Sequence, residues 1–88
     1  MKEFVIQGLR YRIRKGGPGI GWPCPETYIL EQIHTAQRSR NRKAEFYDEA
    51  RRLMRACTVD ELLRYVAQIS RAGIDEIRII LDEAKEEE

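Results

Sequence analysis

The chain has 88 residues, a formal net charge of +1, 42% hydrophobic residues and 35% charged residues. This length fits one domain with a modest core, and the apolar content excludes a disordered chain. The near-neutral charge argues against a dedicated, strongly basic nucleic-acid binder, and no apolar run approaches the roughly 18–20 residues that cross a bilayer. We therefore expect a single domain over residues 1–88, in the cytoplasm, with no membrane contact.

The first predicted element is a β-hairpin within residues 1–15. Gln7-Gly8 is a tight-turn dipeptide, and side chains alternate in character on both sides of it. This turn gives one strand face the apolar residues Phe4, Ile6, Leu9, Tyr11 and Ile13. The opposite face carries Val5 and a basic row: Arg10, Arg12, Arg14 and Lys15. A lone hairpin is barely stable, so its apolar face should pack on the rest of the chain.

Residues 16–24 are predicted to form a loop, because four glycines and two prolines in nine residues break both helix and strand. The stretch lacks the GK[ST] ending of a phosphate-binding loop and does not match GxGxxG. We expect Ile20 and Trp22 to pin the loop onto the core. As an alternative, Trp22 is a partner-contact residue, since tryptophan is enriched at binding hot spots.

Residues 25–57 are predicted to be helical. Pro25 suits a first helical turn, and Ile29, Ile33 and Ala36 form a stripe at helical spacing. A second stripe, around which we expect the fold to be organised, runs through Phe46, Tyr47, Ala50, Leu53, Met54 and Cys57. Asn41 can adopt the left-handed conformation that ends a helix, which favours two helices over one continuous helix.

Two more helices are predicted before the C-terminus. Thr58 to Glu61 has the pattern of a capping box, and the helix after it should bury Val59, Leu62, Leu63, Val66, Ile69 and Ser70. Gly73 is expected to end that helix, and a last helix follows from Asp75, with a fraying acidic tail at 86–88. The expected fold class is α+β: an N-terminal β-hairpin packed on a bundle of three to four α-helices, with residues 25–88 as the helical part.

The sequence gives little support for catalysis or metal binding. His34 is the only histidine, and Cys24, His34 and Cys57 lack the compact spacing of a zinc site. Cys24 at a helix N-terminus would be the one suggestive thiol, because the helix dipole lowers a thiol pKa. We expect two reduced cysteines, with a single bridge between them as the alternative. The prediction is no enzyme, no cofactor and no metal.

Charge is distributed unevenly along the chain, and this asymmetry suggests how the protein acts. Besides the hairpin row, a second basic cluster without any acid lies at the predicted joint between helices: Arg38, Arg40, Arg42 and Lys43. The chain then ends in an acidic run after Asp75.

Opposed charges on a small neutral domain favour a non-catalytic protein-interaction module that docks through charged surfaces or pairs with itself as a homodimer. Its size and make-up suit an accessory, adaptor or inhibitor protein, such as those of phages and mobile elements. The alternative is a DNA-binding or RNA-binding protein that uses the two basic clusters. No small-molecule substrate is evident.

Overall fold

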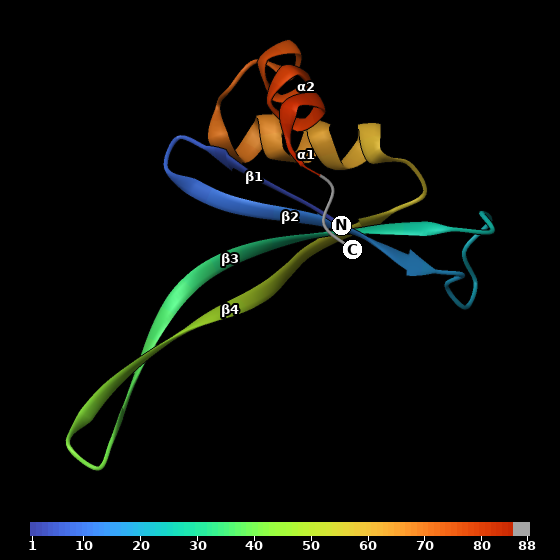
Figure 1. Cartoon of the computed structure of the whole chain (residues 1–88). Helices are drawn as coiled ribbons and strands as arrows, with labels where there is room; N and C mark the ends of the chain where they lie inside the picture. The colour runs from blue at the N-terminus through green and yellow to red at the C-terminus, as the bar shows by residue number, and fades with distance from the viewer. Residues whose placement is uncertain (86–88) are drawn as a thin grey trace.

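The computed structural model describes residues 1–85, apart from the side chain of Arg40. It is an α+β fold in which a four-stranded antiparallel sheet, in the order β1-β2-β3-β4, is followed by two helices. The elements are β1 Lys2–Ile6, β2 Leu9–Gly17, β3 Thr27–Arg40, β4 Lys43–Ala56, α1 Val59–Ser70 and α2 Ile74–Glu83. Both helices lie on one face of the sheet, here called the inner face (Figure 1). The opposite, outer face carries no helix in the described part of the chain.

The β1–β2 hairpin forms as the sequence predicts. Lys2 pairs with Ile13, Phe4 with Tyr11 and Ile6 with Leu9, so Gln7 and Gly8 are the turn. Both turn residues have positive φ, 53° and 79°, which is the twist that a two-residue hairpin requires. The alternation of side chains therefore fixed the register, because a slip of one residue would exchange the two faces.

The prediction of helices over residues 25–57 is wrong. These residues form β3 and β4, two 14-residue strands joined by a turn at Asn41 and Arg42. As a result, the hairpin does not pack on a bundle of three to four helices. The stripe expected to be the spine of the core is largely exposed, with Phe46 68% and Tyr47 43% accessible.

The physical reason is that β3 is the second central strand of the sheet. Its first part is buried on both faces, with Ile29 1% and Leu30 0% exposed, so no period-two alternation is visible in its sequence. β4 is solvent-exposed on both faces from Lys43 to Arg52, so it has no apolar face to alternate. Without a period-two signal, the accidental spacing of apolar residues resembled a helix.

The two C-terminal helices agree with the sequence more closely. Thr58 is the N-cap of α1 and accepts a hydrogen bond from the Glu61 amide at 3.4 Å. The predicted stop at Gly73 is wrong, because Arg71 adopts the left-handed conformation after α1 and Gly73 is instead the N-cap of α2. Ile69 is 47% exposed rather than buried. The expected fraying at 86–88 lies outside the described residues.

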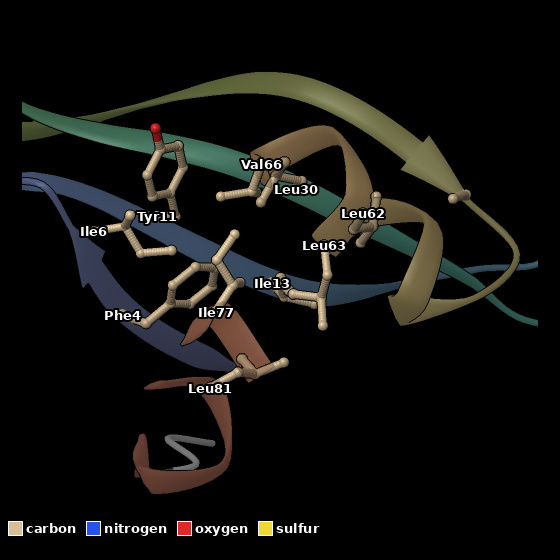
Figure 2. Packing of buried hydrophobic residues seen from close by; sticks show 11 residues of the cluster. Phe4, Ile6, Tyr11, Ile13, Leu30, Leu62, Leu63, Val66, Ile77 and Leu81 are labelled. Carbon is tan, nitrogen blue, oxygen red and sulfur yellow. The ribbon is translucent and has the colours of Figure 1, made fainter. Parts of the chain in front are cut away.

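One core lies between the inner face of the sheet and the helices. The strands contribute Phe4, Ile6, Tyr11, Ile13 and Leu30, and the helices contribute Leu62, Leu63, Val66, Ile77 and Leu81 (Figure 2). The rings of Phe4 and Tyr11 stack with centroids 5.7 Å apart. Burial raises the pKa of the Tyr11 hydroxyl, and the nearby Tyr65 adds to this shift.

A disulfide joins Cys24, in the loop before β3, to Cys57, the residue after β4. The expectation of two reduced thiols is therefore wrong, as is the idea of a reactive Cys24 at a helix N-terminus. The predicted loop begins later than expected, because Gly16 and Gly17 still belong to β2. None of the helices in the described residues is long and apolar enough to cross a membrane.

Candidate functional site

The basic row of β2 lies on the outer face of the sheet, as the hairpin register predicts. Arg10, Arg12 and Arg14 pair across the sheet with Ile33, Glu31 and Ile29 of β3. Directly cross-strand residues share a face, so the next neighbours of Glu31 and Ile29 on this face are Arg52 and Arg55 of β4. The outer face therefore carries a network of arginine side chains around a few apolar and acidic residues.

Glu31 lies at the centre of this arginine network. Its side chain is only 9% exposed, and its Oε1 accepts hydrogen bonds from Nε and Nη2 of Arg12, at 3.1 and 3.0 Å, and from Nε of Arg14, at 2.8 Å. Ile29 and Ile33 are buried beside it, although both helices of the described residues lie on the other face of the sheet. Because arginine stems are apolar, the side chains flanking these isoleucines cover them while the charged ends reach solvent.

Arg10 connects the sheet to the outer part of β4. Its Nη1 and Nη2 donate to Oδ1 and Oδ2 of Asp48, each at 3.1 Å, and Thr35 also donates to Asp48 at 3.4 Å. The hydrogen bonds from Arg10 hold the pKa of Asp48 below its ordinary value, and the same contact raises the pKa of Arg10. The arginine row is thus largely neutralised within the chain, so it is a weaker anion site than its sequence suggests.

The ends of β3 and β4 extend beyond the sheet as a two-stranded ribbon, which we call the arm (Figure 1). The second predicted basic cluster lies at its tip: Arg38, Arg40, Arg42 and Lys43. Arg38, Arg42 and Lys43 are exposed, and Arg40 pairs with Lys43 in the last rung of the ladder. The cluster predicted at a helix joint is therefore the end of a projecting β-ribbon.

The turn at the arm tip has an unusual residue. Asn41 and Arg42 have φ values of 51° and 63°, the same left-handed combination as Gln7-Gly8 in the first hairpin. Glycine adopts this conformation freely, and asparagine tolerates it, whereas a side chain like arginine is disfavoured there. The chain thus has a cation at the apex of the arm where glycine would be the more stable choice.

An aromatic pair accompanies the basic tip. The guanidinium carbon of Arg38 lies 5.5 Å from the ring centroid of Tyr47, a cation–π contact, and Phe46 is more exposed still. Sequence reasoning missed both aromatics as surface residues because it assigned them to a buried helical stripe. It also missed Glu31 and Asp48 as partners of the β2 arginines, because each acid binds an arginine that is far away in the sequence.

Trp22 lies in the loop at the opposite end of the sheet from the arm tip (Figure 1). Its indole is packed against Gly19, whose carbonyl accepts a hydrogen bond from the Trp22 amide at 3.1 Å. Ile20, between them, is fully exposed, so neither residue pins the loop to the core. The predicted contact residues therefore fall into separate regions: Trp22 in the loop, and Arg10, Arg12, Arg14 and Lys15 in β2, with the other four at the arm tip.

The side chains that the sequence analysis considered for catalysis or metal binding lie apart in the described structure. His34 is exposed and pairs with Glu49 across the ladder at 3.2 Å. No group of three or more histidine, cysteine or acidic side chains gathers there in a way that could hold a metal ion. A surface hollow beside β1 is lined by Glu3, Phe4, Val5, Arg10 and Lys85, which do not form a nucleophile–base pair.

Comparison with known proteins gives no match to a protein-family model, to a curated protein or to a solved structure.

Proposed function

We propose that this protein binds double-stranded nucleic acid by inserting the arm tip into a groove. The observation that carries the proposal is the position of Arg42 at a positive φ on the apex of a ribbon whose tip, residues 38–43, includes four cations and no acid. Such a ribbon offers its charges to phosphates from a narrow, exposed support.

The dimensions of the tip support insertion. Three residues on each strand, at about 3.3 Å per residue, span about 10 Å, comparable with groove depths of about 8.5 and 7.5 Å in B-DNA. The first acid, Glu45, pairs across the ladder with Arg38, at the base of the basic tip. Asp48 and Glu49 lie further back, so they would stay outside the groove. The cations of residues 40–43 lie nearer the apex than Glu45, so they would enter ahead of any acid of the arm.

The distribution of the other charges supports the arm over the remaining surface. The row on β2 is occupied by Glu31, Asp48 and Glu3, so it offers fewer free charges to phosphate. The acidic helix α2 packs over β1 on the inner face, away from the arm, so its described acids do not cover the tip (Figure 1). This arrangement favours nucleic acid over docking of the tip on an acidic segment of the same chain.

Removing three tip cations is expected to abolish most binding. We would measure fluorescence anisotropy of duplex DNA and duplex RNA across a salt series for the intact protein and for R38A/R42A/K43A. Four phosphate contacts predict a slope of log K against log salt of about −3.6, and loss of three contacts should reduce its magnitude by about 2.7.

The matched control removes three exposed cations elsewhere, in R64A/R78A/K85A. The control is expected to bind like the intact protein. Equal binding by the tip variant, or no binding by the intact protein at low salt, would refute the proposal.

The Arg42→Gly substitution should separate stability from binding. Glycine relieves the left-handed strain at φ 63°, so the free energy of unfolding should rise by about 0.5–1 kcal/mol. The same change removes the apical cation and should weaken duplex binding with a salt slope about 0.9 smaller in magnitude. Urea unfolding and anisotropy on one preparation test both parts, and unchanged affinity would show that Arg42 does not contact phosphate.

A further inference from the structure

The outer edge of β4 is available to pair with another strand. β4 is the last strand of the sheet, and among the described residues no strand lies beyond it. From Lys43 to Arg52 every residue is exposed, and the strand contains no proline that would block a new ladder. An edge of this length presents a row of free backbone N–H and C=O groups to any partner with a compatible sequence.

The sequence of β4 is complementary to itself about Ala50. Moving outward from Ala50, each acid has a base at the same distance on the other side, and each apolar residue has an apolar counterpart. The symmetric pairs are Glu49 and Arg51, Asp48 and Arg52, Tyr47 and Leu53, Phe46 and Met54, and Glu45 and Arg55. Two copies of the strand, run antiparallel with a two-fold axis at Ala50, would place the central residues, 48 to 52, opposite their symmetric counterparts.

In the central part of β4, residues 48 to 52, the side chains lie on the faces of the sheet that this pairing requires. Asp48, Ala50 and Arg52 pair with outer-face residues of β3, whereas Glu49 and Arg51 pair with inner-face residues. The two central pairs, Asp48 with Arg52 and Glu49 with Arg51, therefore each lie on one face, as cross-strand contact requires. The register shift beside Leu53 lies outside this five-residue centre. Beyond it the symmetric residues lie on opposite faces of the sheet, so the proposed contact is confined to residues 48–52.

Neighbouring registers are much poorer. Moving the axis to Glu49 would oppose Tyr47 to Arg51 and Asp48 to Ala50, and both central ion pairs would be lost. Moving it to Arg51 would oppose Glu49 to Leu53 and Ala50 to Arg52. The charge pattern therefore favours the register centred on Ala50 over both neighbouring registers, because opposite charges face one another only there.

The basic half of this pattern has no acidic partner within the described chain. Asp48 pairs with Arg10 and Glu49 with His34, but no ion pair of the described residues involves Arg51 or Arg52. A carboxylate can accept about four hydrogen bonds, so Asp48 can bind a second guanidinium while it keeps Arg10.

We propose that two copies of this chain associate through β4, antiparallel and centred on Ala50, to form one eight-stranded sheet. Because paired residues point to the same side, the helices of both copies lie on one face and the outer-face arginines of both copies adjoin on the other. The pairing does not involve the arm tip at 38–43, so this inference does not rest on nucleic-acid binding.

Charge reversal of one central pair tests the register. Glu49→Arg and Arg51→Glu should each raise the dimer dissociation constant about tenfold or more, because like charges replace two symmetric ion pairs. An equimolar mixture of the two variants should restore association. In the mixed dimer, the arginine introduced at position 49 faces the glutamate introduced at position 51, and the native Arg51 of the first chain faces the native Glu49 of the second. Sedimentation equilibrium measures all three samples, with Arg64→Glu as a control of equal charge change on α1 that leaves the dimer intact.

A covalent variant makes the test independent of charge. The two Ala50 residues would face each other at the axis, where antiparallel Cα atoms lie about 4.5–5.5 Å apart and a disulfide fits. Ala50→Cys should form a covalent dimer under mild oxidation, whereas Ser39→Cys near the arm tip should not. A monomeric intact protein, single variants that associate like the intact chain, or no selective cross-link at position 50 would each overturn the proposal.

Discussion

Reduction of the Cys24–Cys57 disulfide should lower the free energy of unfolding by about 3.7 kcal/mol. The bridge closes a loop with a sequence separation of 33 residues, and the chain-entropy relation for a loop of that size gives about this value at 25 °C. The loop contains all of β3 and β4, so the bridge stabilises the two strands that the local sequence specifies least. Urea unfolding of the oxidised and reduced protein measures the difference.

The double variant C24S/C57S provides the control for reduction. It should match the reduced protein in stability and show no response to a reducing agent. If the oxidised and reduced proteins unfold at the same urea concentration, the bridge contributes nothing to the free energy of unfolding.

A Leu30→Ala substitution should cost about 3–4 kcal/mol, because Leu30 is fully buried between the sheet and the helices. A Phe46→Ala substitution should change stability by no more than about 0.5 kcal/mol, because the ring is 68% exposed on the arm. The two-helix interpretation of residues 25–57 predicts the opposite order, because it places Phe46 in the core stripe and leaves Leu30 outside the stripe of Ile29, Ile33 and Ala36. Denaturant unfolding of both variants therefore distinguishes the sheet from the helical alternative.

Unfolding of both variants should be measured at low protein concentration, where association through β4 does not add to the apparent stability. Phe46 lies close to the proposed β4 pairing, so a larger effect that appears only at high protein concentration would report on the dimer. A Phe46→Ala cost as large as that of Leu30→Ala in the dilute monomer would contradict the exposed arm.

The sequence predicted only part of the proposed site at the arm tip. The four cations of 38–43 are visible as a cluster without acids, and Asn41 was correctly expected to adopt a left-handed conformation. Its context was wrong, since it starts a hairpin turn and does not end a helix. That difference changes the cluster from a joint between packed helices into the exposed end of a ribbon.

For the basic row on β2, the sequence predicted the position of the arginines correctly but not the acids that bind them. Its face and register followed from alternation and turn chemistry alone, but its charge state did not. Glu31 and Asp48, which neutralise the row, are 17 to 38 residues away from the arginines that they bind. Nothing local in either stretch indicates that these side chains meet, because β3 and β4 were assigned to the wrong element type.

The sequence by itself determined the elements whose signals are local. These are the β1–β2 hairpin, with its turn residues and strict alternation, and the two helices, with the Thr58 cap and apolar spacing. Only the tertiary structure decided that residues 27–56 are strands. β3 is buried on two faces and the arm on neither, so neither strand carries the one-sided pattern by which a strand is recognised. Their pairing instead depends on the ladder, the disulfide and the helices packed over them, and none of these can be read from a local window.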